Sequence, residues 1–205
     1  MRLLKIALLP GYRVLDLAGG FAFHQRLGEA TLKRYRQLII RNVNDATGKH
    51  VLDIGCGVGN FRPYFAGEYT GIDINPSYVL RAREQYSGTF EAMDCGRLAF
   101  ADATFDEVVT IATMHHVADD EVARTIAEAI RVCRPGGYFH IVDAILPVSP
   151  NPLKTLIFKL DRGNHPRTLD HHLSVIGGAG RILTHEVLTG PVHDTVYVRV
   201  GPRST

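Results

Sequence analysis

The feature that most constrains the fold of this chain is residues 51–61, which read VLDIGCGVGNF. A short apolar run, too short and too rich in β-branched residues for a helix, leads into three glycines at alternate positions. Glycine has no Cβ, so the backbone can turn sharply there and lie close to a ligand. The segment therefore predicts a buried parallel strand that runs into a ligand-binding turn.

Two kinds of cofactor-binding turn compete for this pattern. The dinucleotide fingerprint is G-x-G-x-x-G/A, in which the last small residue lets a helix pack on the strand. Here the spacing is G-x-G-x-G, and Asn60 stands where that last small residue would fall. Asp53, two residues before the first glycine, is not required by the dinucleotide motif. A tight turn that binds no ligand is the third interpretation.

The rest of the chain alternates predicted strands and helices, which is typical of an α/β domain with a parallel sheet. We predict strands at 51–54, 69–72, 89–93, 107–111 and 138–142, and helices at 59–65, 76–86, 119–133 and 169–176. The stretches 181–188 and 195–200 are predicted to pair as an antiparallel hairpin at a sheet edge. Residues 12–46 show helical patterning.

Composition excludes several classes of protein. A length of 205 residues suits a single domain, and a net charge of +2 without a dense basic run argues against a nucleic-acid partner. The apolar start of the chain is interrupted by Lys5 and ended by Pro10, unlike a signal peptide, and no run is long enough to span a membrane. Three cysteines without a CxxC pair are read as small buried thiols. We therefore expect a cytoplasmic protein.

Two later predicted strands also end in acidic residues. Asp73 follows Asp53 by about twenty residues, the separation at which a carboxylate accepts hydrogen bonds from both ribose hydroxyls of a nucleoside. Asp94 ends the third strand, where it could accept a hydrogen bond from an adenine amino group. Each aspartate alone is also compatible with a solvated strand end. Together they indicate a nucleoside along one edge of the sheet.

Two further blocks complete the pattern: residues 105–117, FDEVVTIATMHHV, and residues 131–143, RVCRPGGYFHIVD. In this order the five blocks resemble the class I S-adenosylmethionine-dependent methyltransferases, over roughly residues 48–145. The resemblance implies a Rossmann-like, doubly wound seven-stranded sheet, mostly parallel with an antiparallel last strand, within residues 47–203. It also implies that the N-terminal helical segment, residues 1–46, contributes to the substrate pocket.

The resemblance implies roles for individual residues toward S-adenosylmethionine, which leaves as S-adenosylhomocysteine. Gly55, Gly57 and Gly59 would lie against the amino-acid end, and Asp53 would organise their turn. The remaining cofactor contacts would be Asp73 to the ribose, Ile74, Asp94 and Cys95 to the adenine, and Ala112 and Thr113 beside the methionine portion.

Catalytic and substrate residues are less constrained. His115 and His116 follow the fourth strand and are the candidate general bases, although a buried neutral histidine that bridges two loops would look the same. Arg162, His165 and Arg167 fall in one polar segment where arginines could bind a substrate carboxylate or phosphate, or simply pair with neighbouring aspartates. Tyr12 is a further substrate candidate.

No metal site is predicted, because the histidines adopt no ligand spacing and Asp143 lacks the partners it has in metal-dependent catechol methyltransferases. The sequence thus predicts methyl transfer to an oxygen or nitrogen of a small molecule, with an anionic molecule as one candidate acceptor, by a monomer or homodimer. An RNA or protein methyltransferase, an NAD-dependent oxidoreductase and a non-catalytic cofactor-binding module remain alternatives.

Overall fold

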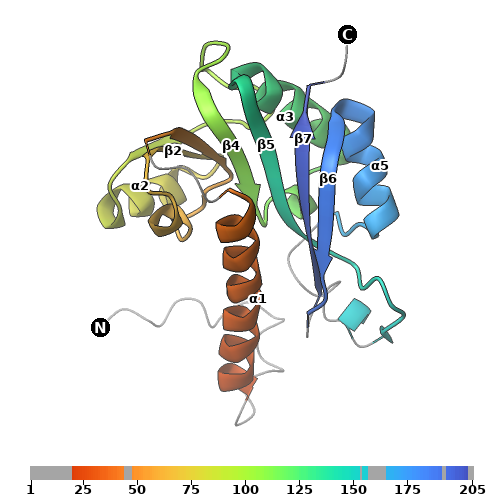
Figure 1. Ribbon diagram of the computed structural model, residues 1–205. Helices are drawn as coiled ribbons and strands as arrows, with labels where there is room; N and C mark the ends of the chain where they lie inside the picture. Colours follow the sequence, from red (N-terminus) through yellow and green to blue (C-terminus); the bar gives the residue numbers. More distant parts are fainter. Residues whose placement is uncertain (1–19, 44–47, 153, 157–164, 191–192, 203–205) are drawn as a thin grey trace.

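A computed structural model describes residues 20–43, 48–152, 154–156, 165–190 and 193–202. Its centre is one seven-stranded sheet in the order β3-β2-β1-β4-β5-β7-β6 (Figure 1). The strands are β1 (His50–Ile54), β2 (Glu68–Asp73), β3 (Thr89–Ala92), β4 (Phe105–Ile111), β5 (Cys133–Ile145), β6 (Arg181–Leu188) and β7 (Asp194–Gly201).

The strand directions confirm the predicted sheet. β1 to β5 pair in parallel, whereas β7, the last strand of the chain, pairs antiparallel with both β5 and β6. Two successive antiparallel pairings return β6 to the direction of β5. The ends of all strands except β7 therefore lie along one edge of the sheet, called the carboxyl edge below. The strand order reverses between β1 and β4, and ligands of such sheets bind at this point.

Helices precede, connect and flank the strands. They are α1 (Gly20–Asn42), α2 (Pro76–Gln85), α3 (Asp119–Val132) and α5 (Leu169–Ala179), with short 3-10 turns η2 (Arg62–Tyr64) and η3 (Met114–His116). The Asn75 side chain accepts a hydrogen bond from the Ser77 nitrogen at 3.0 Å, which caps the start of α2. Figure 1 shows α1 extending beyond the end of β4, past the carboxyl edge.

Two helix predictions need correction. The predicted helix at 59–65 is wrong, because only the 3-10 turn η2 forms there. Gly59 has a φ of +83°, which no α-helix accommodates, and Pro63 lacks an N–H for a helical hydrogen bond. The helix α5 continues through Gly177 and Gly178 to Ala179, beyond the predicted end at residue 176. Its last turn closes where the Gly180 nitrogen donates to the Ile176 oxygen at 2.9 Å.

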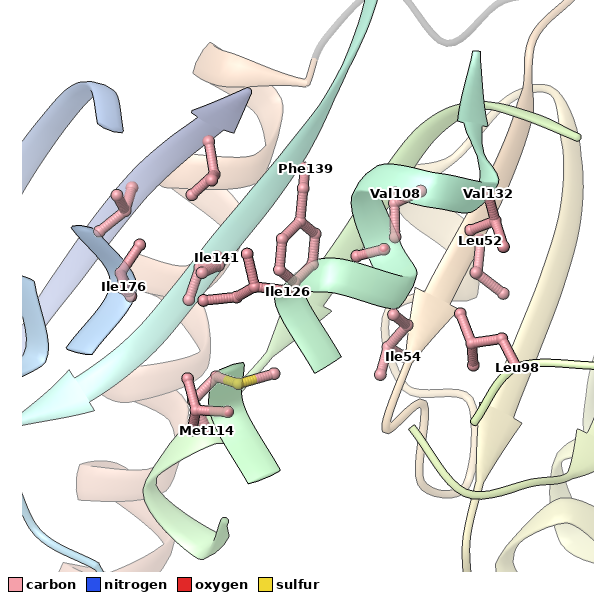
Figure 2. Close-up of a cluster of buried hydrophobic side chains, with 14 of the residues drawn as sticks. Leu52, Ile54, Leu98, Val108, Met114, Ile126, Val132, Phe139, Ile141 and Ile176 are labelled. Carbon is pink, nitrogen blue, oxygen red and sulfur yellow. The ribbon is translucent and has the colours of Figure 1, made fainter. Parts of the chain in front are cut away.

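Hydrophobic cores cover both faces of the sheet, because successive strand residues point to opposite faces. Figure 2 shows one cluster, in which Ile54 of β1, Val108 of β4 and Ile141 of β5 meet Ile126 of α3 and Ile176 of α5. The other cluster joins the alternate strand residues to buried side chains of α1 and α2, including Leu38 and Val79. Burial of each such side chain stabilises the folded state by about 1.5–3 kcal/mol. The two cores therefore fix the strands, and with them the strand ends along the carboxyl edge.

None of the helices in the described ranges is long and apolar enough to cross a membrane.

Candidate functional site

The predicted site residues follow one another along the carboxyl edge. From β3 to β5 the strands end beside Asp94, Asp73, the glycine turn, Thr113 and Asp143. A sheet with parallel strands brings these ends together whatever their separation in sequence. The order of the residues along the edge is therefore set by the order of the strands.

Each of the three glycines of the turn can be explained by what a Cβ at its position would meet. A Cβ on Gly55 would lie 2.4 Å from the Thr113 Oγ1, and a Cβ on Gly59 would lie 2.8 Å from the Tyr86 ring, so both make room for packing. Gly57 has a φ of +55°, and a Cβ there would meet nothing within 4 Å. Gly57 is thus the glycine at which the turn is open to a ligand.

Asp73 supports this turn. Its Oδ2 accepts a hydrogen bond from the Gly57 nitrogen at 2.9 Å, and its Oδ1 accepts one from the Asn75 nitrogen at 2.8 Å. An ionised carboxylate can accept about four hydrogen bonds, so both oxygens retain capacity for a pair of hydroxyls. Ile74, the next residue, is 77% exposed beside it.

Asp53 lies buried behind the turn. The Tyr69 hydroxyl donates a hydrogen bond to its Oδ2 at 2.6 Å, whereas its Oδ1 has no partner among the described residues. Burial raises the pKa of the Asp53 carboxyl to about 7, the charge of Asp73 adds to the rise, and the Tyr69 hydrogen bond opposes it. A buried oxygen without a partner is one that a cationic ligand group can satisfy.

Tyr69 was not predicted as part of the site. The signal for it is the strand register: Val51 pairs with Tyr69 and Asp53 with Gly71, so Tyr69 and Asp53 share one face of neighbouring strands.

The third strand end is more open. Asp94 is exposed, and its Oδ1 accepts a hydrogen bond from the Gly96 nitrogen at 2.8 Å. The Cys95 sulfur is 3.2 Å from the Thr125 hydroxyl that donates to it, and burial raises the pKa of this thiol. Neither arrangement tests the predicted contact with adenine, which stays a prediction.

The end of β4 carries a strained residue. Ala112 has a φ of +55°, a conformation that costs a residue with a Cβ about 1–2 kcal/mol. Its nitrogen donates to the Val142 oxygen at 2.8 Å, which helps to hold it there. Next to it, the Thr113 hydroxyl lies 3.3 Å from the Gly55 oxygen. Thr113 thus joins the end of β4 to the glycine turn.

His115 pairs with an aspartate from the neighbouring strand. Its Nδ1 lies 2.6 Å from Oδ1 of Asp143, and both side chains are buried. Burial alone would raise the pKa of the Asp143 carboxyl, but the attraction of His115 outweighs it, so this pKa is lowered. The pair is therefore best described as a carboxylate that orients an imidazole. His116, by contrast, is exposed.

His172 of α5 lies near this pair and was not predicted to belong to it. Its Nε2 and the Asp143 Oδ2 are buried atoms without a hydrogen-bond partner in the described part of the chain. Burial lowers the pKa of His172, although the negative charge of Asp143 opposes this. The ring is consequently held in its neutral form beside the carboxylate.

Arg167 reaches the same region from a distant segment. Only 4% of its surface is exposed, and its guanidinium donates to Asp119 at 2.8 Å, to the Met114 oxygen at 2.7 Å and to the Val117 oxygen at 2.5 Å. The His165 nitrogen donates to the His115 oxygen at 3.0 Å. These contacts fasten η3 to the residues that lead into α5.

The remaining predicted substrate residues, Tyr12 and Arg162, lie outside the described residues. Within the described ranges, no group of three or more histidine, cysteine, aspartate or glutamate side chains is placed to hold a metal ion.

The sequence of this chain is similar to those of known methyltransferases. Residues 52–141 match a family model described as a methyltransferase domain. An O-methyltransferase of Penicillium expansum is 33% identical over 149 residues, which cover 63% of this chain and 53% of that protein. A sterol 4-C-methyltransferase of Caenorhabditis elegans is 30% identical over 183 residues, covering 80% of this chain and 51% of that protein. The chain therefore spans about half the length of these curated relatives.

The fold has close solved counterparts. A S-adenosylmethionine-dependent methyltransferase of Methanosarcina mazei superposes with a TM-score of 0.63 at 22% identity, covering 81% of this chain and 98% of that one. At this identity the likeness shows a shared fold, within which the site described above lies at the carboxyl edge.

Proposed function

We propose that this chain is a class I S-adenosylmethionine-dependent methyltransferase, as the match of residues 52–141 to a methyltransferase domain indicates, and that it transfers a methyl group from that cofactor to an oxygen atom of a small molecule. The single observation that carries the cofactor part of the proposal is the turn at Gly57. The space beside the Gly57 Cα is open to a ligand, and the Asp73 carboxylate accepts a hydrogen bond from the Gly57 nitrogen.

The residues present fit this cofactor at both of its polar ends. Asp53 offers the buried Oδ1 to an amino group, and Asp73 offers the remaining capacity of its carboxylate to the ribose hydroxyls. Ile74 presents an exposed apolar side chain suited to one face of an adenine ring. When bound, the cofactor supplies an electrophilic methyl group, and the chain has to hold and align the reactants.

The choice of an oxygen acceptor rests on the His115–Asp143 pair. A hydroxyl must lose its proton when it is methylated, and a positioned histidine can accept that proton. With Nδ1 directed at Asp143, the neutral imidazole carries its proton there, and Nε2 is the basic nitrogen. His115 is therefore the proposed general base, because it is buried against Asp143, whereas His116 is exposed.

The names of the relatives agree on methyl transfer as the reaction but not on the atom that accepts the methyl group. The Penicillium protein is named an O-methyltransferase, whereas the Caenorhabditis protein is named a sterol 4-C-methyltransferase. The two names differ in the atom that receives the methyl group. The oxygen assignment is accordingly carried by the buried histidine and carboxylate of this chain.

Arg167 takes a positioning role in this proposal instead of binding substrate. Its donors are engaged by Asp119 and by backbone oxygens on either side of His115. Arg167 would thereby hold His115 in a fixed position relative to the end of β4. Tyr12, Arg162 and His165 stay predicted acceptor contacts.

A screen with methyl-labelled cofactor tests the proposal. The wild-type chain is incubated with panels of hydroxyl, carboxyl and amine acceptors of similar size, and methylated products are identified by mass spectrometry. We expect transfer to hydroxyl acceptors, strong loss of turnover in His115→Gln, and near-normal turnover in the matched variant His116→Gln. Product from amines alone, or equal rates in the two variants, would contradict the oxygen assignment.

A further inference from the structure

A hollow of 530 Å³ lies between α1 and the end of β6. Lys33, Arg34 and Gln37 of α1 line one side of it, and the run 187–189 lines the other. Because β6 runs in the direction of β5, its last residues lie on the carboxyl edge. The hollow therefore opens at the same edge as the proposed methyl-transfer site.

Its distance from that site follows from the strand order. Three strand spacings separate β6 from β4 in the sequence β4-β5-β7-β6. With neighbouring strands about 4.8 Å apart, the hollow lies roughly 14 Å from the end of β4. An elongated small molecule can span this distance.

The hollow is positively charged, unlike the surroundings of the other cations on α1. Arg36 stacks over the Tyr64 ring at 5.2 Å, and Arg41 forms an ion pair with Glu186. Lys33 and Arg34, by comparison, form no ion pair with any described carboxylate. Two neighbouring cations that form no ion pair within the described residues favour a negatively charged ligand.

Arg34 is partly buried, which strengthens its attraction for a negatively charged group. Burial lowers the pKa of its guanidinium, and electrostatic interactions with Tyr35 and with the Asp194 carboxylate oppose this only in part. The guanidinium packs directly on Gly190, where an added Cβ would lie 2.5 Å from Cζ. Its Nη2 donates to the Thr31 hydroxyl at 3.3 Å, and its buried Nε has no hydrogen-bond partner among the described residues.

Asp194 connects the hollow to the segment that follows β5. Its Oδ1 accepts from the Gly190 nitrogen at 3.1 Å, and its Oδ2 accepts from the Val148 nitrogen at 2.9 Å. Lys154 lies 3.7 Å from the same carboxylate. The segment that leaves β5 shortly after Asp143 and the wall of the hollow thus share one buried anchor.

We propose that Lys33 and Arg34 bind a carboxylate or phosphate group at the end of the methyl acceptor remote from the methylated atom. Gln37 adds a neutral donor, and Val187 and Leu188 provide apolar contact for the adjoining part of the acceptor. This assignment rests on the proposed methyl transfer, because it takes the occupant of the hollow to be the acceptor. It moves recognition of an anionic acceptor from Arg167 to α1.

Calorimetry on the full chain with matched probes tests the assignment. Octyl phosphate, octanoate and octanol share an alkyl chain and differ in the charge at its end, and S-adenosylhomocysteine is titrated separately. We expect the wild type to bind both anions more tightly than octanol. The double variant Lys33→Gln/Arg34→Gln should weaken anion binding at least about tenfold, since each charge-assisted hydrogen bond is worth at least that factor.

Arg36→Gln is the control, because it removes the same charge from the same helix but lies over Tyr64. It should leave the anion affinities unchanged, and all variants should bind S-adenosylhomocysteine as the wild type does. If the double variant fails to fold, Lys33→Gln alone changes only an exposed side chain and should still weaken anion binding several-fold.

The outcomes separate the two proposals. Anion affinities equal in the wild type and the double variant, or octanol binding as tight as octyl phosphate, would overturn the anion site while leaving methyl transfer intact. Binding of the anions without any binding of S-adenosylhomocysteine would remove methyl transfer and, with it, the assignment of the hollow to the acceptor. Preference for one anion over the other identifies the acceptor group as phosphate or carboxylate.

Discussion

Asp73, at the end of β2, accepts a hydrogen bond at 2.9 Å from the backbone nitrogen of Gly57, in the turn that follows β1. The glycine turn is therefore held by the residue expected to bind the ribose. A second bond, from the Asn75 nitrogen, fixes the orientation of the carboxylate. Cofactor recognition and the shape of the turn thus depend on the same side chain.

Replacement of Asp73 by alanine is expected to weaken S-adenosylhomocysteine binding by well over about tenfold, because it removes an acceptor for the ligand and two hydrogen bonds that shape the turn. Isothermal titration calorimetry measures the loss. Asp94→Ala, at the exposed end of β3, is the comparison and should cost less. An Asp73→Ala variant with wild-type affinity would contradict the assignment.

Gly57→Ala should spare folding and impair binding. The alanine has open space but a left-handed backbone, so a stability loss of about 1–2 kcal/mol is expected. Gly48→Ala is a matched control, since Gly48 also has a positive φ of +74° and open space around its Cβ. Denaturant unfolding should give similar losses for both variants, while only Gly57→Ala loses cofactor affinity. Equal affinities in the two variants would mean that no ligand approaches Gly57.

The buried Asp53 predicts an unusual pH dependence of stability. Its pKa of about 7 in the folded state lies above the ordinary value of 3.8 for an aspartate, so between these values the folded chain keeps a proton that the unfolded chain has lost. Stability should therefore fall as pH rises from about 4 to about 7, by an amount on the order of 4 kcal/mol, and level off above.

Urea unfolding of the wild type and of Asp53→Asn across this pH range isolates the effect, because asparagine does not titrate. The difference in unfolding free energy between the two should shift steadily against the wild type as pH rises. A difference independent of pH would show that Asp53 ionises normally.

Asp143→Asn is expected to lower kcat on a hydroxyl acceptor by about a hundredfold or more, because the amide neither fixes the His115 tautomer nor stabilises its protonated form. The KM for S-adenosylmethionine should change little. The pH profile of kcat should also move, since His115 would lose a negatively charged neighbour. A fall in stability with unchanged kcat and pH profile would make the pair purely structural.

Arg167→Met should lower stability by about 3 kcal/mol, because it leaves the Val117 oxygen without its buried donor and takes one of two donors from the Met114 oxygen. Arg124→Met, which breaks an exposed ion pair with Asp120, should cost less than about 1 kcal/mol. Guanidinium unfolding compares the two. An Arg167→Met variant of normal stability that raised only the acceptor KM would contradict the positioning role and support Arg167 as a substrate ligand.

The sequence predicted the strands well, since a parallel sheet buried on both faces leaves continuous apolar runs such as 51–54 and 107–111. It failed at 59–65, where apolar residues suggested a helix but Gly59 and Pro63 enforce a 3-10 turn. The spacing of apolar residues does not distinguish an α-helix from a 3-10 turn when the segment begins at a glycine with a positive φ.

The contacts of the site were harder to predict than its residues. His115 and Asp143 were both noticed, but their pairing depends on β4 and β5 being neighbours and on the path of η3. Nothing in the segment around Arg167 reveals that its guanidinium meets the Met114 oxygen, 53 residues earlier. Long-range pairings of this kind come from the packing of whole elements.

The order of the strands has a further consequence. Apart from Ala112 and Thr113, which follow β4, the residues expected to recognise the cofactor come from β1, β2 and β3, on one side of the point where the order reverses. The proposed acceptor groups come from β4, β5, β6 and α1. Thr113, touching Gly55, is a direct side-chain link between the two halves. A chain organised in this way can exchange the molecule that receives the methyl group while its donor half stays untouched, so grafting a different second half is a realistic route to new products.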